Sequence, residues 1–245
     1  MILALLAAAS AAPQTFTEVK KISIVLPIGD ITMLGQPGTD TVTITSTERD
    51  WAENCALVMI EEAGETRVRV TVSEDGHRRK RSEACTLDLS VLMPPHLSVK
   101  LDVGIGDIRL NGLTGPVELD LGVGDLTTEI TGPLEADIGA GCIQGSAGLL
   151  DADVGAGSVR LAGLSGDAHV SVSAGDVGLT WLTLPNDIDI SVGAGSVLVT
   201  LPDGSIFEAD LDTGIGGVNS LFEQRDGANS QVEIDVGVGN ISIIR

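Results

Sequence analysis

The chain has 245 residues, of which 43% are hydrophobic, and its formal net charge is −21 at pH 7. This apolar content can bury a large core, so the composition argues against an intrinsically disordered chain despite the charge. The acidic balance also makes nucleic acid and anionic lipid surfaces poor partners, because it repels phosphate groups. The 31 glycines and the 2% aromatic content fit a narrow β structure, in which β-branched side chains pack and large rings do not.

The first residues have features of a secretion signal. Residues 2–9 form a short apolar run, and Ala9-Ser10-Ala11 matches the small-x-small pattern that signal peptidase accepts. We predict that residues 1–12 are a signal peptide and that the protein is exported to the periplasm or beyond the cell. No basic residue precedes the apolar run, so a displaced start or a non-signal role for residues 1–12 stays open. The run is too short to span a bilayer, and Asp, Gly or Pro interrupts every later apolar segment.

Residues 16–100 are predicted to form short antiparallel strands that could cap residues 101–245. Alternating or apolar runs, separated by polar turns, indicate the strands. They are Val19–Leu26, Thr41–Thr45, Ala56–Ile60, Thr66–Val72 and Thr86–Leu92.

Two features of this region, a pair of cysteines and a basic run, each allow two interpretations. Cys55 and Cys85 either remain reduced in the core or form a disulfide, whose loop entropy is worth roughly 3–4 kcal/mol. The basic run His77–Arg81 is either a solvated hairpin tip or a contact for an anion or an acidic partner, including a second copy of this chain.

Residues 101–245 repeat one short phrase, an apolar residue followed by Gly-x-Gly and then a small or polar residue. Eight copies start at Gly104, Gly122, Gly139, Gly155, Ser173, Gly193, Gly214 and Gly237. A period near twenty residues is typical of stacked coils. Each repeat contains two short strands and two turns, and one such unit cannot bury its apolar side alone. Pro27–Ile31 echoes the phrase, so the stacking could begin there.

Aligned on this phrase, the flanking positions form aliphatic columns that we expect to face inward. The column before the phrase contains Val103, Leu121, Ile138, Val154, Val172, Val192, Thr213 and Val236, and the column after it contains Ile108, Leu126, Ile143, Val159, Val177, Val197, Val218 and Ile241. The predicted fold is therefore all-β, a single-stranded β-solenoid (β-helix) of about eight coils with an N-terminal antiparallel strand region. The final strand, Ile241–Ile244, is predicted to be an open edge through which the protein could self-associate.

Aspartates recur two residues before the first glycine, and we expect them on an outer face. They are Asp102, Asp120, Asp137, Asp153, Asp212 and Asp235, with Ser171 and Ser191 in two other copies. Like charges about one strand spacing apart repel one another, so either calcium or water and salt must relieve the repulsion. Asp107, Asp125 and Asp176 could add calcium ligands. However, the spacing differs from the calcium-binding nonapeptide repeat.

Catalytic, cofactor-binding and metal-binding residues are all predicted to be absent. The histidines His77, His96 and His169 lie far apart, and only a few rings, Trp181, Phe207 and Phe222, could form sugar platforms in the repeats. Gly104-Ile105-Gly106 is followed by no third glycine opening a helix, which argues against a dinucleotide site. No cysteine spacing resembles a zinc site, and the third cysteine, Cys142, stands where other copies have Asp.

The segment from Leu92 to Gly115, with Met93-Pro94-Pro95 followed by Gly104-Ile105-Gly106-Asp107-Ile108, resembles the bacterial putative-adhesin family of β-strand-repeat domains of unknown function. The resemblance covers residues 20–245. It implies an envelope β-solenoid with no established activity and no catalytic residues to carry over. This chain differs from the family pattern in its longer last three repeats and in Cys142, Ser158 and Ser196 after the phrase.

We therefore expect a non-catalytic exported scaffold or interaction surface at the bacterial cell envelope, with an envelope protein or polysaccharide as partner. The alternatives are a calcium-binding acidic repeat protein and, behind it, a polysaccharide-active β-helix enzyme. An ice-binding face is a remote fourth, because residues such as Thr127, Thr128 and Thr200 form no regular column.

Overall fold

A computed structural model describes residues 3–7, 13–50, 55–62, 65–72, 85–223 and 225–245. The regular secondary structure in this part of the chain consists entirely of β-strands, which confirms the all-β prediction. The chain divides into two units, residues 1–124 and residues 125–245. The basic run at residues 77–81 lies outside the described residues.

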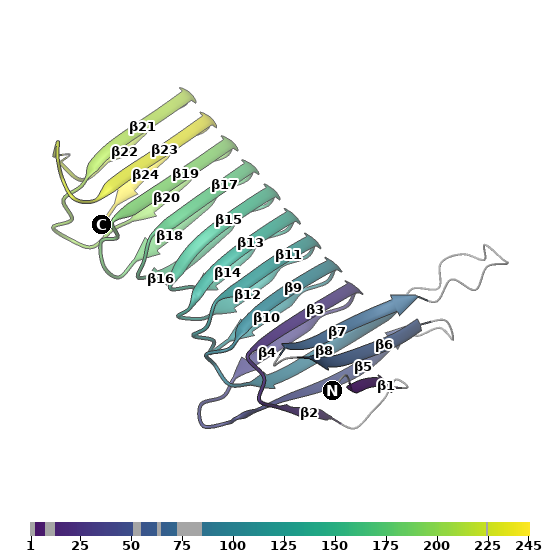
Figure 1. Cartoon of the computed structure of the whole chain (residues 1–245). Coiled ribbons are helices and arrows are strands. Elements are labelled where there is room, and N and C mark those ends of the chain that lie inside the picture. Colours follow the sequence, from purple (N-terminus) through teal and green to yellow (C-terminus); the bar gives the residue numbers. More distant parts are fainter. Residues whose placement is uncertain (1–2, 8–12, 51–54, 63–64, 73–84, 224) are drawn as a thin grey trace, which may run out of the picture. The chain divides into compact units, whose positions relative to one another are not determined.

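The first unit combines parallel and antiparallel strands (Figure 1). It contains β1 (Leu3–Ala7), β2 (Gln14–Thr17), β3 (Lys21–Ile28), β4 (Ile31–Gly35), β5 (Thr41–Asp50), β6 (Cys55–Glu62), β7 (Glu65–Val72), β8 (Thr86–Met93), β9 (Ser98–Ile105), β10 (Ile108–Asn111) and β11 (Val117–Val123). One parallel ladder runs β7–β3–β9–β11 and another runs β8–β4–β10. The antiparallel pairs are β1–β6, β6–β7, β2–β5 and β5–β8.

The echo of the repeat phrase at Pro27–Ile31 is a true first turn. Ile28 aligns with Ile105, and Ile31 aligns with Ile108, so β3 and β4 stack on β9 and β10 as one coil on the next. Strands are present at all five runs predicted between residues 16 and 100, but the expectation of an antiparallel region is wrong for β3, which pairs in parallel with β7 and β9. Gly29 explains the difference, because its φ of 145° forms the same turn as the later glycines.

Of the two alternatives for Cys55 and Cys85, the structure shows the disulfide. Cys55 at the start of β6 is bonded to Cys85 just before β8, with Cα atoms 5.7 Å apart. The bond joins two strands that do not pair with each other, so it restrains the antiparallel part of the first unit where no ladder does.

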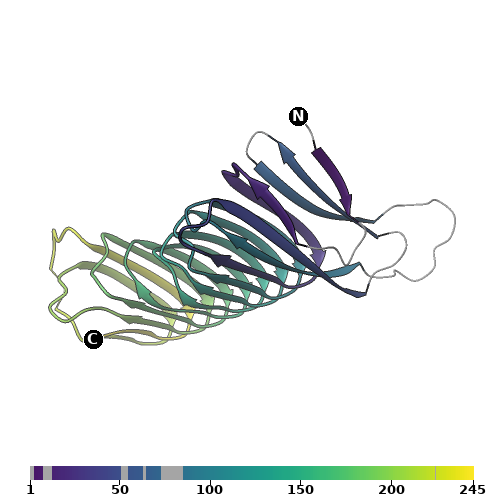
Figure 2. The ribbon, with the colours of Figure 1, turned by 90° about the horizontal axis from the view of Figure 1, so that it is seen from below.

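The second unit consists of two parallel ladders between which the chain alternates (Figures 1 and 2). Its strands are β12 (Leu126–Glu129), β13 (Pro133–Ala140), β14 (Ile143–Ser146), β15 (Leu149–Ala156), β16 (Val159–Leu164), β17 (Ala168–Ala174), β18 (Val177–Trp181), β19 (Asp187–Ala194), β20 (Val197–Thr200), β21 (Glu208–Ile215), β22 (Val218–Ser220), β23 (Gln231–Val238) and β24 (Ile241–Ile244). The long ladder runs β13–β15–β17–β19–β23–β21, and the short ladder runs β12–β14–β16–β18–β20–β24–β22. This strand connectivity is that of a solenoid-like parallel sheet.

The core of the second unit lies between its two ladders. Side chains alternate between buried and exposed along both, and the predicted aliphatic columns are buried from β12 through β20 and again in β23 and β24. Val154, Val172 and Val192 stand in register in the long ladder. Each coil therefore covers the hydrocarbon of the next, as the periodicity predicted.

Close stacking requires glycine at the second position of each phrase. Gly175 has φ of +148°, and a Cβ there would lie 1.5 Å from the carbonyl oxygen of Gly157. Gly157, Gly195 and Gly239 meet the preceding coil in the same way. Since no L side chain fits such a contact, all eight copies keep this second glycine, whereas the first position accepts Ser173.

The prediction of an open edge at the C-terminal strand is wrong. Ile241 of β24 aligns with Val197 of β20 on one side and with Val218 of β22 on the other. The last coil in the chain is thus inserted between two earlier ones, and β21 and β22 form the end of the second unit. Burial explains this order. The inward columns of β23 and β24 are fully aliphatic, whereas β21 has Ala209 and Thr213 at inward positions, where partial exposure to water costs less free energy.

Candidate interaction surfaces

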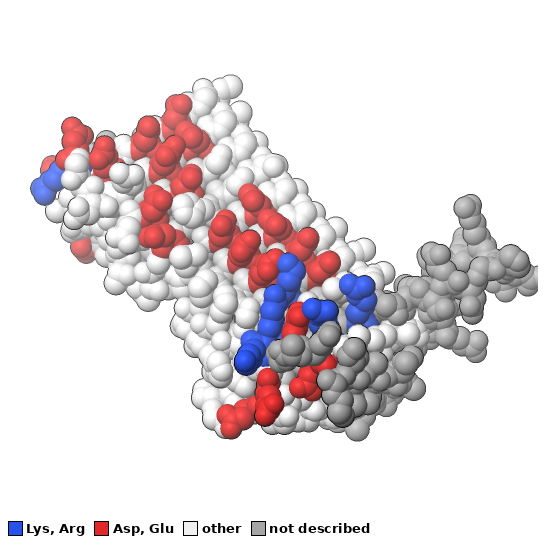
Figure 3. Space-filling model, viewed as in Figure 1, with Lys and Arg blue, Asp and Glu red and all other residues white. Residues whose placement is uncertain are grey.

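The outer face of the long ladder in the second unit is acidic (Figure 3). Its outward side chains form columns across the strands. We call the following set the acidic face: Glu135, Asp137, Asp151, Asp153, His169, Ser171, Asp187, Asp189, Ser191, Glu208, Asp210, Asp212, Gln231, Glu233 and Asp235. The predicted position of the aspartate column on an outer face is confirmed.

Like charges on this face stand about 4.8 Å apart, the spacing of neighbouring strands, so the folded state has to tolerate their repulsion. The columns are interrupted at β17 and β19, where Ser171 and Ser191 occupy one of them. His169 occupies the other, with its Nδ1 3.9 Å from a carboxylate oxygen of Asp189. Neutral residues therefore break the longest run of carboxylates near its middle.

The aspartates that follow the Gly-x-Gly phrase have a different role. Asp176 accepts a hydrogen bond at Oδ1 from the backbone N–H of Ser196 at 2.9 Å, and Asp125 accepts one from Cys142 at 2.9 Å. In both cases the donor belongs to the next coil. These side chains, which the sequence offered as calcium ligands, join adjacent coils. Within the described ranges, no three His, Cys, Asp or Glu side chains form a group that could hold a metal ion.

The outer face of the short ladder is nearly uncharged. Only Glu129 and Arg160 carry charge among its outward side chains. We call the following set the neutral face: Thr127, Gln144, Arg160, Gly178, Leu198, Ser242 and Asn219 in one column, and Glu129, Ser146, Ala162, Thr180, Thr200 and Ile244 in the other. Thr128 is buried and stands apart from both columns, so it adds nothing to a threonine surface.

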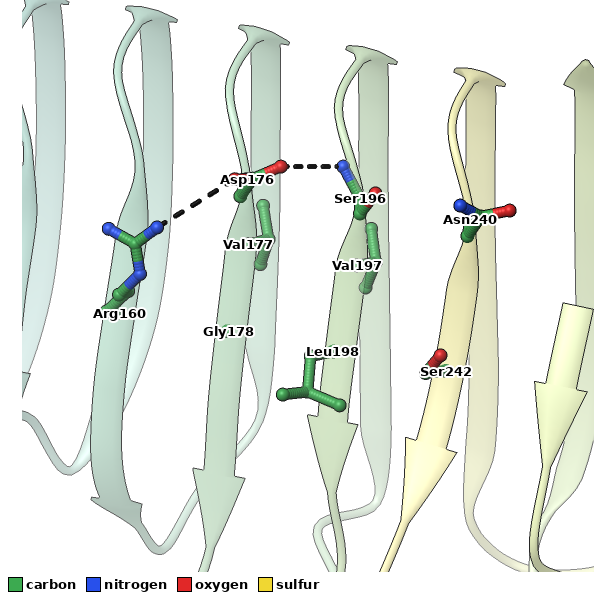
Figure 4. Close-up of a pocket in the computed structure, with 9 residues that line it drawn as sticks. All are labelled: Arg160, Asp176, Val177, Gly178, Ser196, Val197, Leu198, Asn240 and Ser242. Atoms are coloured by element: carbon green, nitrogen blue, oxygen red, sulfur yellow. Dashed lines mark hydrogen bonds and ion pairs between the residues drawn. The ribbon is translucent and has the colours of Figure 1, made fainter. Parts of the chain in front are cut away.

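A hollow opens on the neutral face at Gly178 (Figure 4). Gly178 stands in register between Arg160 and Leu198, and because it has no side chain, a space of about 480 Å³ extends toward Ser196 and Asn240. A second space of about 470 Å³ shares Arg160, Gly178 and Leu198 with the first and continues toward Thr180 and Thr200. The two form one groove that crosses five short strands, β14, β16, β18, β20 and β24.

The side chains of the groove can form hydrogen bonds and one apolar contact. The guanidinium of Arg160 donates to Ser158 Oγ at 2.6 Å and lies 3.8 Å from Asp176. More than half of the Arg160 side chain stays exposed (62%). The aliphatic wall is Leu198, which is 44% exposed. Hydroxyl, amide and guanidinium groups and the carboxylate of Asp176 surround an open floor, and such groups suit an extended ligand that carries hydroxyl groups.

The histidines and aromatic rings named in the sequence analysis are not gathered in the groove. His96 belongs to the first unit and His169 to the acidic face of the second, while His77 lies outside the described residues. Trp181 is buried, with its indole N–H donating to Gly166 O at 2.9 Å. Phe207 is buried against Phe222, their ring centroids 5.6 Å apart.

Sequence reasoning missed the groove, because Gly178 is an ordinary strand glycine in the sequence and its register with Arg160 and Leu198 appears only in the folded ladder. The sole signal was a glycine outside the repeated phrase, in a strand where other copies have Thr127, Gln144 or Leu198.

No protein-family profile matches the chain, and no curated protein sequence matches it. Solved structures that the comparison finds similar to this chain include a putative adhesin from Parabacteroides distasonis, 9% identical, with a TM-score of 0.48, covering 99% of this chain and 97% of that one. A putative adhesin from Bacteroides fragilis is 12% identical, with a TM-score of 0.38 and coverage of 96% and 98%. A putative lipid binding protein from Parabacteroides distasonis is 11% identical, with a TM-score of 0.36 and coverage of 96% and 98%.

Two of these structures are named putative adhesins, the name of the family that the sequence resembles. Across the described part of the chain, no helix has the length and hydropathy that a membrane span requires.

Proposed function

We propose that this chain is a single-stranded β-solenoid of about eight coils that is exported and serves, without catalysis, as an interaction surface at the bacterial cell envelope. The groove at Gly178 is the observation that carries the proposal. It is open to solvent, it crosses five strands of one ladder, and it lies on the nearly uncharged face of a strongly acidic unit. A partner can therefore lie along it without meeting the acidic face.

Export is supported by the disulfide. A bond between Cys55 and Cys85 persists in the periplasm or outside the cell, whereas cytosolic thiols are usually kept reduced. Removal of residues 1–12 as a signal peptide would also remove β1, which pairs with β6 along the outer side of the first unit.

The partner that best fits the groove is an extended, weakly charged envelope polysaccharide. Ser196, Asn240 and Ser242 line one end of it and can exchange hydrogen bonds with sugar hydroxyls, while Leu198 can contact a ring face. A strongly anionic polymer is a poorer fit, since the net charge of the chain repels it. An envelope protein remains the alternative occupant.

The test is binding of the folded chain to immobilised envelope polysaccharides, with a variant that fills the groove. Gly178→Leu adds a side chain where a Cβ has only Arg160 Cγ within 4 Å, at 3.8 Å, so the fold should tolerate it. We expect it to weaken binding about tenfold or more. The matched control, Ser171→Leu, adds the same bulk to the acidic face and should bind like the unchanged chain. Equal binding by Gly178→Leu, or no binding by the unchanged chain, contradicts the proposal.

Calcium binding is a second candidate, because the carboxylate columns of the acidic face stand in register on adjacent strands. Isothermal titration of the folded chain with calcium chloride tests it. Saturable heat that disappears when Asp210 and Asp212 are both replaced by Asn would support a bound cation. A flat titration removes this candidate.

A further inference from the structure

The end of the second unit is an unfinished ladder. β21 pairs only with β23, and β22 only with β24, among the residues that the structure describes. In the preceding coils the amide of the second glycine donates to the next coil: Gly175 to Ala194 O, Gly195 to Val238 O and Gly239 to Ile215 O, each at 2.9 Å. Gly216 is the next amide in this series, and it points to where a further coil would lie.

The edge of β21 repeats this arrangement along its length. The amide of Glu208 donates into the ladder, to Ser230 O at 2.9 Å. Successive amides of a strand point to opposite sides, so the amides of Ala209, Leu211 and Thr213 face outward from the ladder. The edge therefore offers a row of backbone donors and acceptors to an added strand.

The apolar side of this last coil is also incompletely covered. Ile234 and Val236 of β23 are buried, whereas Leu211 and Thr213, their partners on β21, are only half-buried. Ile215 is 71% exposed and Val218 is 46% exposed. A strand placed beside β21 with aliphatic residues at its inward positions would complete the core.

Charge determines which strand fits. The outward side chains of β21 are Glu208, Asp210 and Asp212, and they adjoin Glu233 and Asp235 on β23. A hollow of about 250 Å³ lies among Asp187, Glu208, Asp210 and Glu233. An added strand would hold its outward side chains about 4.8 Å from the three carboxylates of β21, where Lys or Arg is stabilising and Asp or Glu is destabilising.

We infer that β21 and β22 form a docking edge for an extended segment of another protein in which aliphatic residues alternate with Lys or Arg. A second copy of this chain is a poor occupant, because it would bring the same three carboxylates to the contact. Acidic side chains on an edge can also serve only to prevent aggregation. However, β21 has neither proline nor an inward-pointing charge, which are the features that would block an oppositely charged strand.

This edge is separate from the groove at Gly178, and its test is independent of the proposed function. The probe is a fluorescent octapeptide of alternating Lys and Val, titrated with the folded chain at low ionic strength and followed by anisotropy. The first control peptide has the same composition, with four Lys followed by four Val. The second alternates Lys with N-methylated Val, which removes hydrogen-bond donors but keeps the charge.

We expect the alternating peptide to bind at least about tenfold more tightly than either control, and binding to weaken when Leu211 is replaced by Asp. Gly178→Leu should leave binding of the alternating peptide unchanged, so the test of the docking edge and the test of the groove can fail independently. Equal binding of all three peptides would mean that charge alone attracts them and would overturn the inference. Absence of binding would overturn it as well. If sedimentation shows a dimer that Leu211→Asp disrupts, the occupant of this edge is a second copy of the chain and not another protein.

Discussion

The two units hold their strands in place by different means. In the second unit the coils repeat, and glycine turns together with the side chains of Asp125 and Asp176 join adjacent coils. In the first unit the strands differ in direction, and cross-links between side chains do more of this work. In a repeat, identical coils align in the same register, whereas in an irregular sheet particular side chains have to fix the register.

Arg49 shows how the first unit uses such a cross-link. Its guanidinium lies 2.8 Å from Asp30 and 2.5 Å from Asp88. Hydrogen bonding to Asp88, followed by the charges of Asp88 and Asp30, raises the pKa of Arg49 above its ordinary value. Asp30 in turn accepts a hydrogen bond from the amide of Asp107. In the first unit, too, an aspartate side chain therefore joins one coil to the next, beside an arginine on β5.

The largest expected effect comes from a matched pair of glycines three residues apart in the second unit. Gly175→Ala forces a Cβ to within 1.5 Å of a carbonyl oxygen at φ of +148°, and we expect a loss of roughly 3–5 kcal/mol in the free energy of unfolding. Gly178→Ala meets only Arg160 Cγ, at an ordinary contact distance of 3.8 Å, and should change stability by less than about 0.5 kcal/mol. Urea unfolding followed by circular dichroism measures both, and similar losses at the two sites would contradict the stacking argument.

The disulfide should be the counterpart of these glycines in the first unit. Replacing Cys55 and Cys85 by Ser opens a loop with a sequence separation of 30 residues, which we expect to cost roughly 3–4 kcal/mol. Calorimetric unfolding with and without reductant measures it, and the reductant should affect only the unchanged chain. Cys142→Ser is the control, since Cys142 is the free cysteine of the described residues. If the double replacement behaves like this control, the cross-link does not stabilise the first unit.

A smaller effect is expected from replacing Asp176, whose side chain joins two adjacent coils. Asp176→Ala leaves the amide of Ser196 without its acceptor and should cost about 1 kcal/mol. Asp176→Asn keeps an acceptor oxygen, as Asn240 does for the amide of Gly217, and should recover most of this loss. Asp153→Ala, on the acidic face beside Asp137, should leave stability unchanged or raise it slightly by removing repulsion. Equal losses for Asp176→Ala and Asp153→Ala would contradict these separate roles.

The smallest effect is a pH dependence in the first unit. A hydrogen bond from Arg67 at 2.7 Å lowers the pKa of Glu65 below its ordinary 4.5. The ionised form is therefore favoured in the folded state, and its contribution to stability is present above pH 4.5 and is lost as the pH falls through the lowered value. Glu65→Gln should be slightly less stable at neutral pH and should match the unchanged chain below the lowered pKa. A difference that persists in acid would point to packing rather than charge.

Much of the repeat could be predicted from the sequence because its signals are local. The alternation around each Gly-x-Gly phrase placed Val154, Val172 and Val192 in one buried column, and Pro27–Ile31 marked the first turn. The alternating runs around Cys55 and Cys85 indicated strands, although the sequence left open whether the two thiols are bonded. In each case the decisive residues lie within a few positions of one another, or the period repeats often enough to fix their alignment.

Two features were decided only by the tertiary structure. The groove depends on the register of Arg160, Gly178 and Leu198, which belong to three different strands and meet only after the coils stack. The place of the last coil, between β20 and β22, also has no local signal. It depends on which coil loses least by leaving its apolar side in water, a comparison of burial free energies over the whole second unit. Sequence spacing fixes what one coil contains, and competition for burial fixes which coils become neighbours.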